Sequence, residues 1–158
     1  MKTASTRGDG QVGEDVTTNA KTIEAIPLSF ANAEKIRKFL SNKIEVRGEV
    51  LISKKNFKRI NQEQKKEGAQ LYANPRNLAA GSIRQLDSKI TASRRLDFLA
   101  YGLFVDSGSI THEAEHEYLA LLGFKTDRLA RSFGDPKEAV AFRDKIAESR
   151  ESLEYGVD

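Results

Sequence analysis

The chain of 158 residues carries 26 lysines and arginines against 23 aspartates and glutamates, which gives a net charge of +3, and 39% of its residues are hydrophobic. This composition is typical of one globular domain and excludes a disordered chain. The absence of cysteine excludes disulfides and cysteine-ligated metals. No apolar run approaches the roughly 20 residues of a membrane span. The small basic excess is compatible with nucleic acid as a partner.

The first part of the chain predicts a turn followed by two short helices. Polar residues 1–12, with two glycines near their end, predict a strand end that runs into a turn. Residues 13–23 place three apolar side chains at helical spacing and predict a short helix. A second helix is predicted over residues 32–40, with Asn32 as its cap.

Residues 44–52 alternate between two kinds of side chain and predict a β-strand. One face carries Ile44, Val46, Gly48 and Val50. The opposite face carries Glu45, Arg47 and Glu49. Alternating charges usually lie on an exposed strand face. The alternative is the wall of a polar pocket, in which a carboxylate accepts hydrogen bonds from a sugar hydroxyl or holds a metal-bound water.

Cap residues predict four further helices. Their starts are Ser53, the Asn74-Pro75 pair, Thr111, whose helix ends at Gly123, and the D-P-K-E capping box at 135–138, whose helix runs to about Arg150. Residues 96–104 predict a buried strand. Strands and helices without regular β-α-β alternation predict the α+β class.

The stretch LYANPRNLAAGSIRQLD at 71–87 combines a helix start, small residues and two arginines. Arg76 and Arg84 lie about two helical turns apart. Each arginine alone is equally consistent with an exposed surface residue. Together they favour phosphate recognition, because a guanidinium binds phosphate through two donors and small side chains allow a close approach. The helix start at Asn74-Pro75 adds an attraction for anions.

The segment HEAEH at 112–116 matches the H-E-x-x-H zinc motif. On a helix, His112 and His116 would share a face and hold zinc, with Glu113 as general base. A catalytic zinc needs a third protein ligand, and the chain contains only these two histidines. Glu138 is the best remaining candidate. We interpret the segment as an exposed helix start, and a small zinc hydrolase is the alternative.

Four stretches, in the same order, resemble the adenylation (nucleotidyltransferase) domain of bacterial NAD-dependent DNA ligase. They are STRGDGQVGEDVTTNAKTIEAIPL at 5–28, IEVRGEVLI at 44–52, YANPRNLAAGSIRQLDSKIT at 72–91 and LDFLAYGL at 96–103. The resemblance covers essentially the whole chain, residues 1–158. It implies an α+β nucleotidyltransferase fold with antiparallel sheets flanked by helices.

The resemblance implies part of an enzyme that seals nicks in duplex DNA during replication and repair. In that family, the lysine of a K-x-D-G motif attacks the α-phosphorus of NAD and keeps AMP. AMP then passes to the 5′-phosphate at the nick, and the 3′-hydroxyl displaces it. The implied cofactors are NAD and Mg²⁺, with the zinc of the full-length family outside this chain. The implied partner is nicked duplex DNA, and we expect a monomer in the bacterial cytoplasm.

The resemblance also implies roles for five residues. Glu49 would line the AMP pocket and bind the ribose, and Arg7 would lie near the nucleotide or the nick. Arg76, Arg84 and Arg150 would contact phosphates at the nick.

No catalytic residue of the family is expected within this chain. Residues 1–158 contain no K-x-D-G motif and only the start of D-G-x-V-x-K. Arg7 opens an R-G-D-G sequence of similar shape, but a guanidinium stays protonated and is a poor nucleophile. We therefore expect a partial adenylation domain that is inactive alone. The alternative is a nucleic-acid-binding remnant without chemistry.

Overall fold

The computed structural model describes residues 1–32, 34, 44–105 and 111–156. In chain order the elements are α1 (Thr17–Ala20), β1 (Ile44–Leu51), α2 (Lys54–Lys66), α3 (Pro75–Ser82), α4 (Ser88–Arg94), β2 (Asp97–Val105), α5 (His112–Leu121), α6 (Pro136–Ser149) and the 3-10 helix η2 (Arg150–Ser152). The α+β class is confirmed for the described residues. The helix predicted over 32–40 falls largely outside them.

The four predicted helix caps are confirmed. Each side chain accepts a hydrogen bond from a backbone N–H of the first turn: Ser53 from Asn56, Asn74 from Arg76 and Asn77, Thr111 from Ala114, and Asp135 from Lys137. Such bonds satisfy donors that a helix start otherwise leaves unpaired. Gly123, just after α5, has a φ of +93°, which favours glycine there. Helix α4 was not predicted, although Asp87 caps it in the same way.

Strands β1 and β2 pair antiparallel, with a bulge at Tyr101. Arg47 lies opposite Gly102 and Gly48 lies opposite Ala100, so Tyr101 has no partner in β1. The extra residue reverses the alternation of β2 and leaves Tyr101 exposed. A Cβ at Gly48 would lie 2.2 Å from the Phe98 ring, so only glycine fits there. The prediction of a buried strand is therefore correct for one face only.

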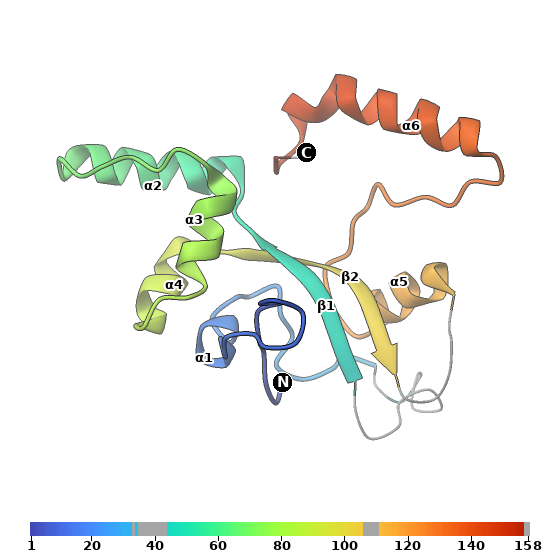
Figure 1. Ribbon diagram of the computed structural model, residues 1–158, viewed down its shortest axis with the longest axis horizontal. Coiled ribbons are helices and arrows are strands. Elements are labelled where there is room, and N and C mark those ends of the chain that lie inside the picture. The colour runs from blue at the N-terminus through green and yellow to red at the C-terminus, as the bar shows by residue number, and fades with distance from the viewer. Residues whose placement is uncertain (33, 35–43, 106–110, 157–158) are drawn as a thin grey trace.

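The core lies where α1, α3, α5 and the strands meet. Figure 1 shows α3 and α4 at one end of the strand pair and α5 beside β2. The buried apolar cluster comprises Val16, Ile23, Ile52, Ile60, Leu78, Ala79, Ile83, Leu96, Phe98, Ala100, Leu103, Leu119, Leu122 and Phe124. Burial of these side chains is the main favourable contribution to folding. The three apolar side chains predicted to define the first helix are all buried, although α1 itself has only four residues.

Helix α6 stands apart from the strand pair (Figure 1). None of its residues is buried. Its predicted apolar face is only partly covered, because Phe142 and Ile146 are half-buried and Ala139 is exposed. The Phe142 ring packs on Phe133, with centroids 5.3 Å apart. No helix within the described ranges is both long and apolar enough to span a bilayer.

Candidate functional site

A tight loop at residues 5–15 carries Arg7. Asp9 Oδ1 accepts hydrogen bonds from the backbone N–H groups of Val12 and Gln11, at 2.8 and 2.9 Å. These bonds, that from Val12 first, hold the pKa of Asp9 below its ordinary value. Gly8 has a φ of +54°, and a Cβ there would overlap the Val12 carbonyl. The loop therefore presents Arg7 on an exposed but well-defined turn.

Arg84 meets this loop through an ion pair. Its Nε lies 2.6 Å from Glu14 Oε2, and both side chains are about half exposed, at 52% and 64%. The buried amide of Asn19 donates to the carbonyls of Ile83 and Gln85, both at 2.7 Å. The backbone on either side of Arg84 is thus fixed by α1, while its guanidinium remains accessible.

Arg76 and Arg84 do not share one helix, contrary to the prediction from their spacing. Helix α3 ends at Ser82, and Arg84 lies beyond its C-cap residue. The chain turns there because the Asn19 amide donates hydrogen bonds to the carbonyls of Ile83 and Gln85. The Thr91 hydroxyl also donates to Ser82 O, at 2.8 Å. Asn19 lies 64 and 66 residues from the carbonyls that it binds, so helical spacing could not reveal the turn.

Arg76 lies in the first turn of α3. Its backbone N–H donates to Asn74 Oδ1 at 2.7 Å, and the residue is exposed. The small residues of α3 have two different surroundings. Ala79 and Ser82 are buried, whereas Ala80 and Gly81 are exposed. The small-residue pattern therefore serves core packing as well as an open surface.

Glu49 lies on the exposed face of β1, as the alternation predicts, opposite Leu99 of β2. On the same face, Arg47 pairs with Glu45 at 2.7 Å and its guanidinium lies over the Phe104 ring, 4.0 Å from the centroid. Within the described part of the chain, Glu49 forms no ion pair. Its carboxylate is therefore exposed on a backbone that the strand pair fixes.

Arg150 begins η2, and its Nε lies 3.7 Å from Glu151 Oε1. Lys54, at the start of α2, binds this segment through hydrogen bonds. Its Nζ donates to the carbonyls of Arg150 and Glu151, at 3.2 and 2.8 Å, and its backbone N–H donates to Glu154 O at 3.0 Å. The backbone at Arg150 is thus held at α2. Within the described part of the chain, Arg150 forms polar contacts with Lys54 and Glu151 and not with the other four predicted residues.

A cluster that the sequence did not indicate joins Asp97, Lys125 and Tyr155. Lys125 Nζ donates to Tyr155 Oη at 2.7 Å and to Asp97, and the Tyr155 hydroxyl donates to the same Asp97 oxygen. Burial opposes ionisation of Asp97, but these hydrogen bonds outweigh it and lower the pKa of Asp97. Burial likewise opposes the charge on Lys125, yet the bond to Asp97 raises its pKa to about 12.

Two hollows lie away from the predicted residues. The larger, of about 550 Å³, is bordered by Ser53, Asn56, Arg95, Asp97 and Tyr155 among others. The smaller, of about 240 Å³, lies along α2. None of the five predicted residues lines either hollow.

The two histidines lie at the start of α5, with ring centroids 4.7 Å apart in an edge-to-face arrangement. His112 is mostly exposed, and its Nδ1 lies 3.3 Å from Glu115 Oε2. Across the residues that the structure describes, no three His, Cys, Asp or Glu side chains gather into a possible metal site. Glu138 lies in the first turn of α6 and does not complete a site. The geometry gives the zinc hydrolase alternative no support.

Comparison with known proteins points to one family. The family model for the NAD-dependent DNA ligase adenylation domain matches residues 1–158. A protein named DNA ligase from Listeria innocua is 44% identical over 159 residues, which cover 99% of this chain and 22% of that protein. A DNA ligase from Sulfurimonas denitrificans is 45% identical over 161 residues, which cover 100% of this chain and 23% of that protein. The chain spans less than a quarter of the length of these relatives.

Proposed function

Because the chain belongs to the NAD-dependent DNA ligase adenylation domain family, we propose that it forms part of an enzyme that seals single-strand nicks in duplex DNA. The enzyme would join a 3′-hydroxyl to a 5′-phosphate through enzyme–AMP and DNA–adenylate intermediates. The observation that carries this proposal is the family match over residues 1–158. A nucleotidyltransferase fold, a monomeric state and a role in replication and repair belong to the same proposal.

The nucleophilic lysine of this proposal lies outside residues 1–158. NAD would supply the adenylyl group, and Mg²⁺ would offset the charge that develops on the phosphates. No three acidic side chains of the described residues gather around a possible cation. Mg²⁺ usually binds through one or two carboxylates and takes its other ligands from phosphates and water.

Glu49 is proposed to bind the ribose of the adenylyl group. An ionised carboxylate only accepts hydrogen bonds, and a ribose offers hydroxyl donors. The exposed position of Glu49, without an ion pair among the described residues, leaves its oxygens available. Pairing between β1 and β2 fixes the backbone, so the carboxylate needs little reorganisation to bind.

Arg7, Arg76, Arg84 and Arg150 are proposed to bind phosphates of the nucleotide or of the DNA at the nick. Arg84 is the best supported, because Asn19 holds its backbone while its guanidinium faces Glu14 at a half-exposed site. A phosphate group would compete with Glu14 for this guanidinium. Arg76 lies at the start of α3, where backbone N–H groups and the helix dipole also favour anions.

The proposal is tested first by binding. We expect the chain to bind duplex DNA with a 5′-phosphorylated nick more tightly than the intact duplex of the same sequence. Fluorescence anisotropy at fixed salt measures both affinities, and salt must be fixed because phosphate contacts are salt-dependent. Equal affinities for the two duplexes would contradict the proposed nick recognition.

A sealing assay separates the partial enzyme from the binding remnant. With NAD and an ordinary nick, we expect no sealing by residues 1–158, because they contain no K-x-D-G lysine. A nick that already carries AMP on its 5′-phosphate bypasses that lysine and needs only attack by the 3′-hydroxyl. Sealing of the adenylated nick above the rate without protein would support a retained catalytic function. Binding without sealing would support the remnant, and sealing of the ordinary nick would contradict the proposed inactivity.

A further inference from the structure

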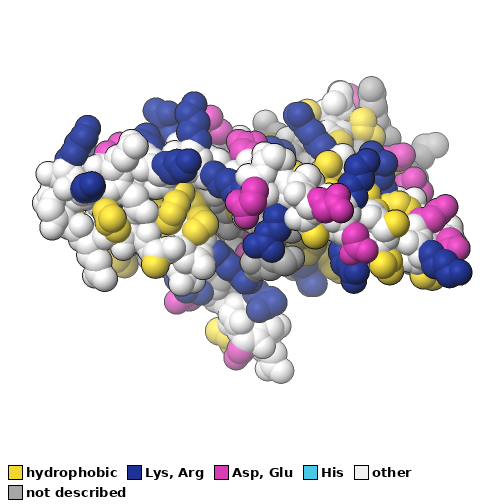
Figure 2. All heavy atoms as spheres, turned by 90° about the horizontal axis from the view of Figure 1, so that it is seen from above, with side chains coloured by type: hydrophobic (Ala, Val, Ile, Leu, Met, Phe, Trp, Pro, Cys, Tyr) yellow, Lys and Arg dark blue, Asp and Glu magenta, His cyan; other side chains and the backbone are white. Residues whose placement is uncertain are grey.

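Helix α2 presents one face made almost wholly of lysine. We define this lysine face as Lys55, Lys58, Gln62, Lys65 and Lys66, all of which are exposed. At 3.6 residues per turn they span roughly 100° of the helix circumference. The buried residue Ile60 lies on the other side. Figure 2 shows dark blue side chains gathered over α2, at the left of the view.

The lysine face is not neutralised by the rest of the described structure. None of its four lysines forms an ion pair with a described residue. The one acid within α2, Glu63, is held by Arg59, whose Nη1 lies 2.8 and 3.1 Å from its two oxygens. Lys55 and Lys58 repel each other three residues apart, and Lys55 also opposes the helix dipole at the N-terminus. Lys65 and Lys66, in the last turn, are favoured by the same dipole, but Lys55 and Lys58 gain nothing from the isolated helix, and a face of one sign favours a polyanionic partner.

Helix α6 provides an internal comparison. It is also exposed, but it interleaves charges of both signs, and Arg143 Nη2 pairs with Asp144 at 2.7 Å. Figure 2 shows dark blue and magenta side chains mixed over α6, at the right of the view. A face of a single sign is therefore a property of α2 and not of every exposed helix in this chain.

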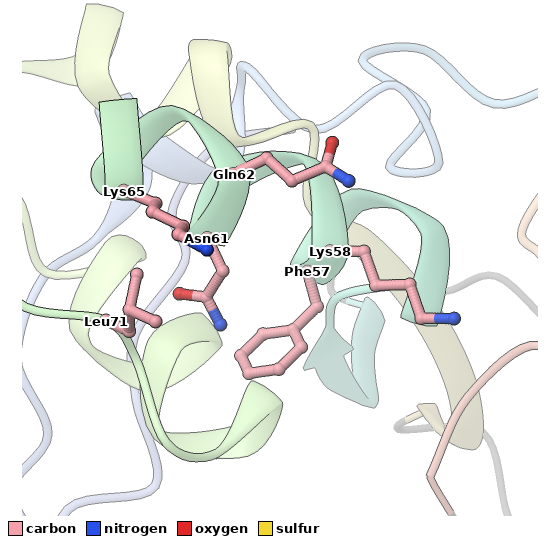
Figure 3. Close-up of a pocket in the computed structure, with 6 residues that line it drawn as sticks. All are labelled: Phe57, Lys58, Asn61, Gln62, Lys65 and Leu71. Carbon is pink, nitrogen blue, oxygen red and sulfur yellow. The ribbon is translucent and has the colours of Figure 1, made fainter. Parts of the chain in front are cut away.

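A preformed hollow of about 240 Å³ runs beside the lysine face. It is lined by Phe57, Lys58, Asn61, Gln62, Lys65 and Leu71 (Figure 3). Asn61 fixes its wall, because its amide donates to Tyr72 O at 2.9 Å and accepts from Tyr72 N at 2.8 Å. Figure 3 shows the Asn61 amide between Leu71 and the Phe57 ring. The segment that forms this wall is therefore held in place before any ligand binds.

The same wall connects the lysine face with the start of α3. Tyr72, held by Asn61, also accepts a hydrogen bond at its hydroxyl from Arg94 at 3.1 Å. Two residues later, Asn74 caps the helix whose first turn carries Arg76. The lysine face and a proposed phosphate-binding residue are thus joined by a short segment with several hydrogen bonds.

We propose that the lysine face of α2 binds the phosphate backbone of duplex DNA next to the nick, whether or not a nick is present. The choice of DNA as the polyanion rests on the proposed function. From Lys55 to Lys66 the helix covers about 16 Å, a length over which a duplex presents roughly ten phosphate charges. Lysine contacts to phosphate carry no sequence information, so the face adds affinity without base specificity.

The test replaces Lys55, Lys58 and Lys65 together with glutamine in the full chain and measures affinity for nicked and intact duplex. Affinity for both is expected to fall roughly tenfold or more at low salt. The slope of log affinity against log salt is expected to fall by about 2 to 3, at about 0.9 for each lost contact. The ratio of nicked to intact affinity is expected to stay unchanged.

Two matched variants control for folding and for net charge. Arginine at the same three positions keeps the charge and is expected to keep the salt slope. Glutamine at Lys2, Lys137 and Lys145, which are exposed outside α2, changes net charge equally and is expected to leave the slope unchanged. Thermal unfolding of every variant confirms that each is folded. An unchanged slope in the α2 glutamine variant, or an equal loss in the second control, would overturn the proposal.

The outcomes distinguish this proposal from the proposed function. Nick preference without any effect of the α2 substitutions would support nick recognition and overturn the role of the lysine face. A strong effect of the substitutions without nick preference would support the lysine face and contradict nick recognition. No measurable binding of the unmodified chain to duplex DNA would overturn both.

Discussion

Asp97 is the single acceptor that joins three distant segments of the chain. Lys125 follows α5, Tyr155 follows η2, and both donate to the same carboxylate oxygen at the start of β2. Lys125 also lies over the Tyr155 ring, 5.0 Å from its centroid. Hydrogen bonds to an ionised carboxylate are roughly twice as strong as those between neutral groups. The two bonds to Asp97 therefore stabilise the folded chain more than bonds to a neutral acceptor would.

The cluster predicts a pH dependence of stability. Because the folded pKa of Asp97 lies below 3.8, its contribution is present above that value and is lost as pH falls through the folded pKa. Because the pKa of Lys125 is raised to about 12, its contribution persists below the ordinary value of 10.5 and is lost as pH rises towards about 12. Asp97→Asn should therefore cost about 1 to 3 kcal/mol near neutral pH and much less in acid.

Thermal unfolding followed by circular dichroism across the acid range measures this difference. The control is Asp127→Asn, at an exposed carboxylate outside the cluster. An Asp97→Asn destabilisation of the same size in acid and at neutral pH would contradict the assigned role of the charge.

The role of a residue could be predicted where its hydrogen-bond partners lie close by in the sequence, and could not where they lie far away. The caps Asn74 and Thr111 could be predicted because their partners lie two or three residues away. Asn19 could not, since the carbonyls that it binds lie 64 and 66 residues further along the chain. The Asp97 cluster is hidden for the same reason.

Among the elements, α3 depends on its cap more than on its apolar content. The helix has eight residues, and its first turn contains no acidic side chain to favour the dipole. Asn74 satisfies the N–H groups of Arg76 and Asn77, and Pro75 fixes the first turn. The start of α3 in turn positions Arg76.

Asn74→Ala is expected to destabilise the chain by about 1 kcal/mol, because the first-turn N–H groups lose their acceptor. Urea denaturation measures the change in the free energy of unfolding. Asn77→Ala is the matched control, since Asn77 is exposed in the same turn and its side chain caps nothing. A cost at Asn77 equal to that at Asn74 would show that the cap is not responsible.

Element types were largely predictable, whereas two irregularities were not. Helix α4 has only one buried residue, Thr91, whose hydroxyl binds Ser82 O, so tertiary contacts specify it more than its own pattern. The bulge at Tyr101 lies beside Gly48, on which the Phe98 ring packs across the strand pair. The local sequence carries no signal for the bulge, whereas the start of α4 has a local one in its cap, Asp87.

For the whole molecule, binding of DNA depends on how the proposed phosphate contacts lie in relation to one another. The structure connects the loop that carries Arg7 with Arg84 through Glu14, and it connects α2 with the segment of Arg150 through Lys54. The sequence motifs indicated which residues belong to the family. They could not indicate these connections, because each joins segments more than 60 residues apart.

Two substitutions test the competition at Arg84. Arg84→Ala is expected to reduce the preference for nicked over intact duplex, because the guanidinium is the proposed contact. Glu14→Gln is expected to strengthen binding to the nick a few-fold, since it removes a competing carboxylate whose exposed pair is worth about 0.2 to 1 kcal/mol. Anisotropy titrations at constant salt measure both effects. Weaker binding of the nick by Glu14→Gln would show that the ion pair positions Arg84 for DNA instead of competing with it.

The segment that contains α6 is held on either side of the helix, and none of the residues of α6 is buried. On one side Lys125 is fixed to Asp97, and on the other the carbonyls of Arg150 and Glu154 are fixed to Lys54. Local opening requires little free energy where few apolar contacts are lost. Among the described residues, a protease should therefore cut between 127 and 149 before it cuts the core around Ile60 and Leu119. We therefore expect the segment with α6 to open and close locally while the strand pair remains folded.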